Sequence, residues 1–112
     1  MKNSNTSAIA EILTKNAESD WFTTPLKGIL NRYIIALTDN INPSLELLNK
    51  QILSFSQLEN INIWGWTNKK DNIKYVDIST STNDLQIALA IAKLFNQKAI
   101  FDIEKLEEII IK

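Results

Sequence analysis

The chain has 112 residues, of which 45% are hydrophobic and 22% charged, with a formal net charge of −1. This length and apolar fraction predict one domain with a single buried core, and the near-neutral charge argues against a basic nucleic-acid-binding protein. The sequence contains no histidine and no cysteine. It therefore excludes the usual zinc sites, thiol nucleophiles, disulfides and histidine general bases.

The first thirty residues are interpreted as an N-terminal helix with a connecting segment, and residues 31–112 as a single α+β domain. Ile9, Ile12 and Leu13 recur at helical spacing and form one apolar edge. Further along, Pro25 would fit the start of a short helix toward Leu30. No apolar run approaches the roughly 18 residues of a membrane span, and no signal peptide is recognisable, so a cytoplasmic protein is expected.

From residue 31 onward the apolar pattern alternates between strand and helix. Compact runs rich in β-branched residues predict strands, and apolar residues three and four apart predict helices. The predicted order is a strand at 32–38, a helix at 43–55, strands at 61–67 and 72–80, a helix at 85–96, a strand at 98–103 and an edge strand at 107–111. This order is typical of a ferredoxin-like split β-α-β sandwich, an antiparallel sheet with two helices on one face.

The two central predicted strands are separated by the polar turn at 68–71. If Thr67 pairs with Asn72, alternation places the side chains on two chemically distinct faces. One face is aliphatic and suits the helices: Ile61, Ile63, Val76 and Ile78. The other is largely aromatic, with polar residues at its far end: Trp64, Trp66, Ile73, Tyr75, Asn62 and Asp77.

If both helices cover the aliphatic face, the aromatic face is left open. Exposed apolar patches of this size mark interaction sites, and Trp and Tyr are frequent hot-spot residues. Three coverings are considered: the chain's own N-terminal segment, a second copy or another protein, and single-stranded nucleic acid stacked on the rings. The mixed local charge disfavours nucleic acid. The partner-binding residues predicted on this face are Trp64, Trp66, Ile73 and Tyr75.

The predicted helix at 85–96 is apolar on nearly all sides. Its stripe of Leu85, Ala88, Leu89, Ala92 and Phe95 suits packing on the sheet. A second stripe either packs on a neighbouring helix or contacts a partner. This second predicted partner-binding surface comprises Ile87, Ile91 and Leu94.

Candidate catalytic residues are sparse. Asp39, Asp77 and Asp102 could hold a metal or act as acid and base only if the fold brought them together, and no spacing links them. The hydroxyls at 79–82 have no histidine partner, and no glycine-rich phosphate-binding motif is present. We therefore predict no enzymatic activity, no metal and no cofactor.

These features favour a small protein that acts by protein–protein contact, as a homodimer, adaptor or inhibitor. Its build is similar to that of many small phage and mobile-element proteins that bind and block a host protein, although no motif carries this likeness. The alternative is a regulatory domain that binds a small molecule between Trp64, Trp66 and Asp77.

Overall fold

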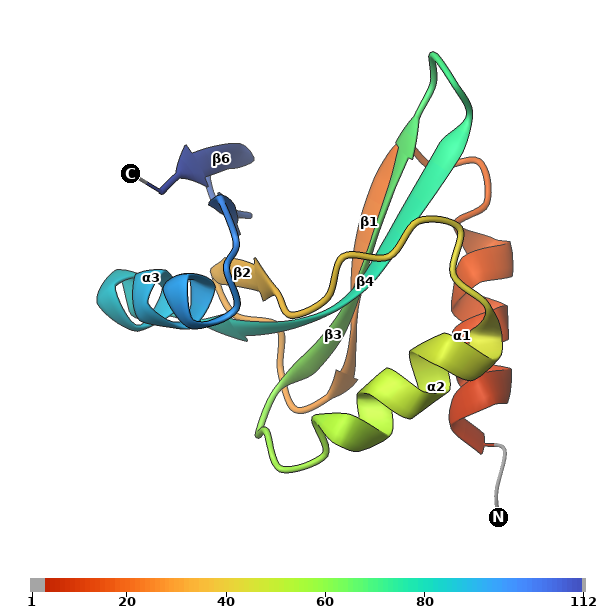
Figure 1. The fold of residues 1–112 in the computed structure, drawn as a ribbon, viewed down its shortest axis with the longest axis horizontal. Helices are drawn as coiled ribbons and strands as arrows, with labels where there is room; N and C mark the ends of the chain where they lie inside the picture. The colour runs from red at the N-terminus through yellow and green to blue at the C-terminus, as the bar shows by residue number, and fades with distance from the viewer. Residues whose placement is uncertain (1–3, 112) are drawn as a thin grey trace.

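Three helices and a six-stranded, open, antiparallel sheet make up the fold (Figure 1). The computed structural model describes residues 4–111, and side chains within the first helix from Ser7 onward. The α+β class is confirmed. The helices are α1 (Ser4–Lys15), α2 (Leu45–Ser54) and α3 (Leu85–Leu94). The strands are β1 (Trp21–Lys27), β2 (Tyr33–Ala36), β3 (Ile61–Asn68), β4 (Ile73–Thr82), β5 (Ala99–Asp102) and β6 (Glu107–Ile110).

Strand β1 is the main departure from the prediction, because the short helix expected from Pro25 does not form. The strand order is β1-β3-β4-β2-β5-β6, so β1 is an outer strand paired antiparallel with β3. An outer strand tolerates proline because one row of its N–H groups has no partner strand. The register shifts between Pro25 and Lys27, where the chain leaves the regular ladder.

The central hairpin has the two predicted faces but a different register. Trp66 lies opposite Tyr75 and Trp64 opposite Asp77, whereas the predicted pairing placed Trp66 opposite Ile73. The register differs by two residues, and a shift of two leaves every side chain on its original face. The aliphatic and aromatic faces are therefore as predicted, while the cross-strand neighbours are not.

All three helices pack on the aliphatic face of the sheet. Leu48 and Ile52 of α2 and Ile9 of α1 are buried against β3 and β4. Ala88 and Ala92 of α3, both fully buried, pack against β2 and β5 through Ile35 and Ile100. Figure 1 shows α1 and α2 beside the β1-β3-β4 part of the sheet and α3 beneath β2. The opposite face carries no helix among residues 4–111.

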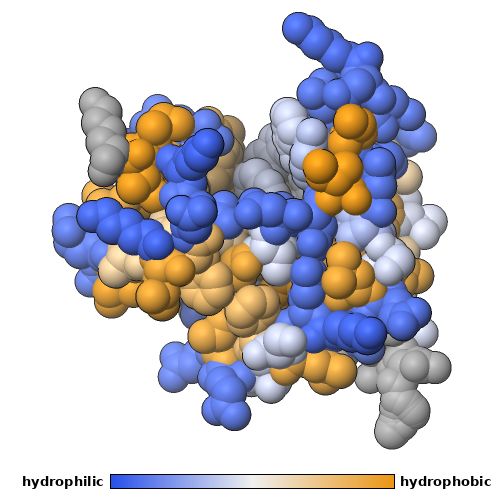
Figure 2. Space-filling view, viewed as in Figure 1, coloured by the Kyte–Doolittle hydropathy of each residue, from blue (hydrophilic) through white to orange (hydrophobic). Residues whose placement is uncertain are grey.

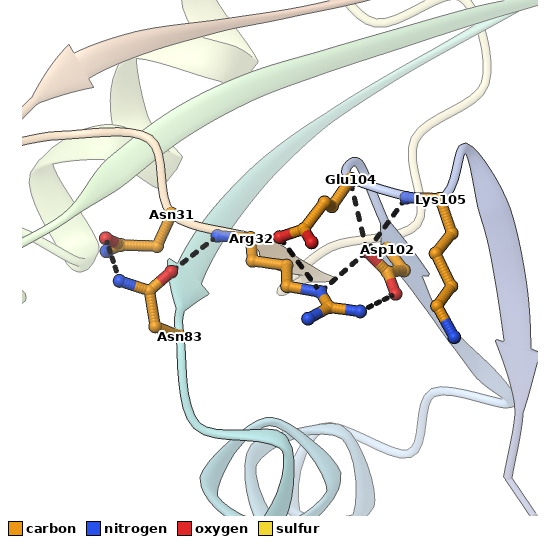
Figure 3. A network of polar contacts seen from close by, with 6 residues as sticks. All are labelled: Asn31, Arg32, Asn83, Asp102, Glu104 and Lys105. Carbon is orange, nitrogen blue, oxygen red and sulfur yellow. Dashed lines mark hydrogen bonds and ion pairs between the residues drawn. The ribbon is translucent and has the colours of Figure 1, made fainter.

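An ion pair fixes the junction between β2 and β5 on the helix-covered side (Figure 3). The buried Asp102 carboxylate accepts hydrogen bonds from Nε and Nη2 of Arg32 at 3.0 and 2.9 Å. The backbone N–H groups of Glu104 and Lys105 also donate to it, at 3.0 and 3.3 Å. These donors, Arg32 first, hold the pKa of Asp102 below its usual value.

The pKa of Asp102 leads to an acid-stability prediction. Because the folded-state pKa is depressed, the ion pair stabilises the fold above the unfolded-state pKa, and this contribution is lost as pH falls through the folded-state value. We expect the urea midpoint of the wild type to fall more steeply below pH 4 than that of Asp102→Asn. Parallel pH profiles for the two proteins would contradict the assignment.

Among residues 4–111, no helix is long and apolar enough to cross a membrane.

Candidate aromatic binding site

The face opposite the helices is concave, because the sheet curls strongly along its width. Strands β1 and β5 are four spacings apart in the strand order, about 19 Å in a flat sheet. Yet the rings of Trp21 on β1 and Phe101 on β5 have centroids 5.6 Å apart. Trp64 contacts both, stacked on Trp21 at 5.4 Å and tilted against Phe101 at 5.0 Å. Figure 2 shows the molecule hollowed between the β1-β3-β4 part of the sheet and the part that contains β5 and β6.

A cavity of about 500 Å³ lies in this concave face. Its size falls within the range typical of small-ligand sites, about 300–1,000 Å³. Trp66 and Tyr75, with centroids 4.9 Å apart, form a second aromatic pair in its wall. The chain has three tryptophans, and all three line this cavity. The complete lining is Trp21, Trp64, Trp66, Tyr75, Asp77, Phe101, Leu106 and Glu108.

A second cavity of about 470 Å³ adjoins the first. The two share Trp64, Phe101 and Glu108 in their linings. The second cavity continues toward the turn between α3 and β5 and has a more polar wall, which includes Asp39 and Lys98. Together the two cavities form one groove along the open face.

Asp77 is the buried charged group of the aromatic cavity. Its Oδ1 accepts hydrogen bonds from the Thr38 hydroxyl at 2.8 Å and from the Asn40 backbone N–H at 2.7 Å. In the described part of the chain no donor is bonded to its Oδ2. Burial raises the pKa of Asp77 to about 6, although the two hydrogen bonds oppose the shift. At neutral pH the cavity therefore holds a largely ionised carboxylate in an aromatic wall.

The segment between β2 and α2 positions this carboxylate. Residues 37–42 continue along β4 beyond the end of β2, bonded through the backbone of Leu37, Asn40 and Asn42. The Asn40 side chain forms paired amide hydrogen bonds with Gln51 of α2, at 2.7 and 3.1 Å. Helix α2, which packs on the other face of the sheet, thus fixes the loop whose Thr38 and Asn40 bind the Asp77 carboxylate.

Within the described residues, the N-terminal segment does not fold back across the aromatic face, which was the first of the three coverings considered. Helix α1 packs with α2 on the opposite face, and β1 extends the open face by adding Trp21. The connection from β1 to β2 also reaches this side, at the end of β4, where the Ser81 hydroxyl accepts from the Asn31 N–H. Near that end Asn62 is fully buried, and neither atom of its amide has a protein partner among the described residues.

The structure brings together three of the four sheet residues predicted to bind a partner. Trp64, Trp66 and Tyr75 line the cavity, with Trp66 44% exposed. Ile73 lies on the same face opposite Asn68, close to the turn and outside the lining. The predicted helix surface is separate because α3 packs on the other face of the sheet. There Ile87 and Leu94 are exposed and Ile91 packs against the core.

Four lining residues were missed by sequence reasoning: Trp21, Phe101, Leu106 and Glu108. For Trp21 the available signal was strand alternation, which places Trp21 on the face opposite to Phe22, but Pro25 favoured a helix. The others depend on the curl of the sheet, which brings β5 and β6 over the hairpin.

The three carboxylates considered for catalysis do not converge on one point, although Asp39 lies close enough to Asp77 to contribute to its raised pKa. Asp102 is paired with Arg32 on the helix-covered side, whereas Asp77 lies on the open face. No group of three acidic side chains that could hold a metal ion occurs within residues 4–111. Comparison of the chain with protein-family models, with curated proteins and with solved structures yields no match.

Proposed function

We propose that this chain is a non-enzymatic binding protein that docks to a partner protein through the open face of its sheet. The observation that carries the proposal is the cavity of about 500 Å³ walled by five aromatic side chains, on a face that no helix of the described residues covers. Concave aromatic surfaces of this kind can receive a projecting side chain and exclude water around it.

Charge supports a basic partner surface. The aromatic cavity is lined by the carboxylates of Asp77 and Glu108 and by no cationic side chain among the described residues. The adjoining cavity adds Asp39 and one cation, Lys98. The open groove is therefore net acidic, which favours a protein that presents Lys or Arg side chains over an anionic partner.

A ferredoxin-like arrangement of residues 33–102 is part of this proposal. The inner strand order β3-β4-β2-β5 and the packing of α2 and α3 on one face support it. The outer strands β1 and β6 then act as additions that lengthen the sheet, and both contribute side chains to the open face.

Trp66→Ala tests the proposed function. Trp66 is partly exposed, so its removal should change the unfolding midpoint by only a few degrees, while binding of a purified partner should weaken about 30-fold. The partner is first captured from an extract on the immobilised wild-type chain and then purified. Calorimetry then measures its affinity for the wild type and for Trp66→Ala.

Leu53→Ala is the matched control, because Leu53 is an exposed apolar residue on α2, away from the open face. It should leave the affinity unchanged. Equal affinities for wild type and Trp66→Ala would overturn the proposal. So would a homodimer, detected by light scattering, that Trp66→Ala dissociates.

A further inference from the structure

We propose that the aromatic cavity receives a quaternary ammonium group, carried by a methylated lysine side chain of the partner protein. This inference rests on the proposed function, since it names the group that enters the same cavity. It is drawn from the chemistry of the lining and from the shape of the groove.

The lining selects a cation with an apolar surface. An anion would meet the carboxylates of Asp77 and Glu108. A neutral apolar group would desolvate the same two carboxylates without compensation. Methyl groups on a cationic nitrogen satisfy both parts of the wall, because aromatic faces attract such a cation and also bury its methyl surface.

The hydrogen-bonding groups of the cavity favour a methylated ammonium over an unmodified one. A primary ammonium carries three N–H donors and a guanidinium five, and each donor needs an acceptor once water is removed. Thr38 and Asn40 already occupy Oδ1 of Asp77, so the free carboxylate acceptors of the cavity are Oδ2 of Asp77 and the carboxylate of Glu108, while five aromatic side chains form most of its wall and their ring faces accept no conventional hydrogen bond. A quaternary ammonium has no N–H and loses no hydrogen bond on entry.

The shape of the groove favours a side chain on a polypeptide over a free small molecule. The adjoining cavity of about 470 Å³ shares Trp64, Phe101 and Glu108 with the aromatic cavity. Its wall is more polar, with Asp39, Asn96, Gln97 and Lys98. This second space suits the backbone that flanks an inserted side chain, and a free quaternary ammonium metabolite would leave it empty.

The test uses synthetic peptides with one central residue changed. The central residue is trimethyllysine, unmodified lysine, or the neutral isostere in which a tert-butyl group replaces the trimethylammonium. Choline is the small-molecule probe. Binding is followed by intrinsic fluorescence, which reports on this site because all three tryptophans line it.

We expect the trimethyllysine peptide to bind about tenfold more tightly than the neutral isostere and the lysine peptide, in line with a desolvated cation–π contact. Trp64→Ala should abolish binding. Glu108→Gln should weaken binding of the trimethyllysine peptide and leave binding of the neutral isostere unchanged. Glu107→Gln is its control, because the neighbouring residue of β6 points to the other face.

Three outcomes would overturn the inference: no peptide binding, equal binding of the isostere, or choline binding as tightly as the peptide, which would indicate a free metabolite. None of these results affects the proposed function if a purified partner still requires Trp66. Conversely, a partner that binds Trp66→Ala normally refutes the docking proposal, whatever the peptides show.

Discussion

Gly65→Ala is expected to lower the free energy of unfolding by about 3 kcal/mol, an overpacking penalty at the upper end of the usual range. Gly65 lies on the helix-covered face of β3, directly opposite Phe22 of β1. A Cβ at this position would overlap the ring atoms Cε1 and Cζ of Phe22. The phenyl ring packs against the core cluster that includes Ile63, so moving it aside sacrifices part of that packing. The loss is measured by urea unfolding.

A double-mutant cycle identifies the cause. Phe22→Ala removes the ring, so Gly65→Ala should cost much less in that background, and the coupling free energy should approach the single-variant loss. Additive effects of the two substitutions would contradict this account.

Gly65→Ala should also displace β1, which would remove Trp21 from Trp64 and weaken ligand binding at the open face.

Asp77→Asn is expected to raise the free energy of unfolding at pH 7 by about 3 kcal/mol, since a difference of one in pKa between the folded and unfolded states corresponds to about 1.4 kcal/mol. Burial raises the folded-state pKa of Asp77 from 3.8 to about 6. Between these values the folded state binds more protons than the unfolded state, so this carboxyl makes the protein less stable as pH rises. An asparagine carbonyl can still accept from Thr38 and Asn40.

The pH profile distinguishes this mechanism from a general packing effect. The difference between Asp77→Asn and wild type should grow from pH 4 to pH 6 and stay constant above it. Asp71→Asn, at an exposed carboxylate in the β3–β4 turn, is the control and should follow the wild type. A difference that does not vary with pH would refute the assignment.

The carboxylate of Asp77 therefore costs stability at a position where an amide would preserve both hydrogen bonds. A carboxylate that lowers stability and is held in an aromatic cavity is better explained by a ligand that binds in the cavity than by a role in folding. The same carboxylate thus accounts for the stability prediction and attracts the proposed ammonium ligand. Asp77→Asn should produce a more stable protein with a weaker site.

The local pattern of the sequence was sufficient for most of the elements and for the two faces of the hairpin. Ile61, Ile63, Val76 and Ile78 alternate with Trp64, Trp66 and Tyr75, so period two alone separates the core from the aromatic face. The two faces are the same in the predicted and the observed register, because a shift of two residues preserves the alternation. Helix α3 begins after Asp84, whose Oδ1 accepts from the N–H groups of Gln86 and Ile87, a cap that depends on local residue preference.

Tertiary structure alone decided how strands β1 and β5 are placed relative to the hairpin of β3 and β4. The sequence contains Pro25, which fits a helix start or an outer strand equally well, and only pairing with β3 selects the strand. The ion pair between Arg32 and Asp102 spans seventy residues and has no local signature. The curl of the sheet carries Phe101 to Trp64 across β4 and β2.

By itself, then, the sequence determined the composition of the open face: an aromatic hairpin with Asp77 among the rings and no histidine or cysteine. These are properties of alternation and residue type, which act over a few positions. The cavity was decided by the tertiary structure, since its wall needs Trp21 from β1 and Glu108 from β6. Twist and curl accumulate over all six strands, so the shape of the site depends on contacts between residues far apart in the chain.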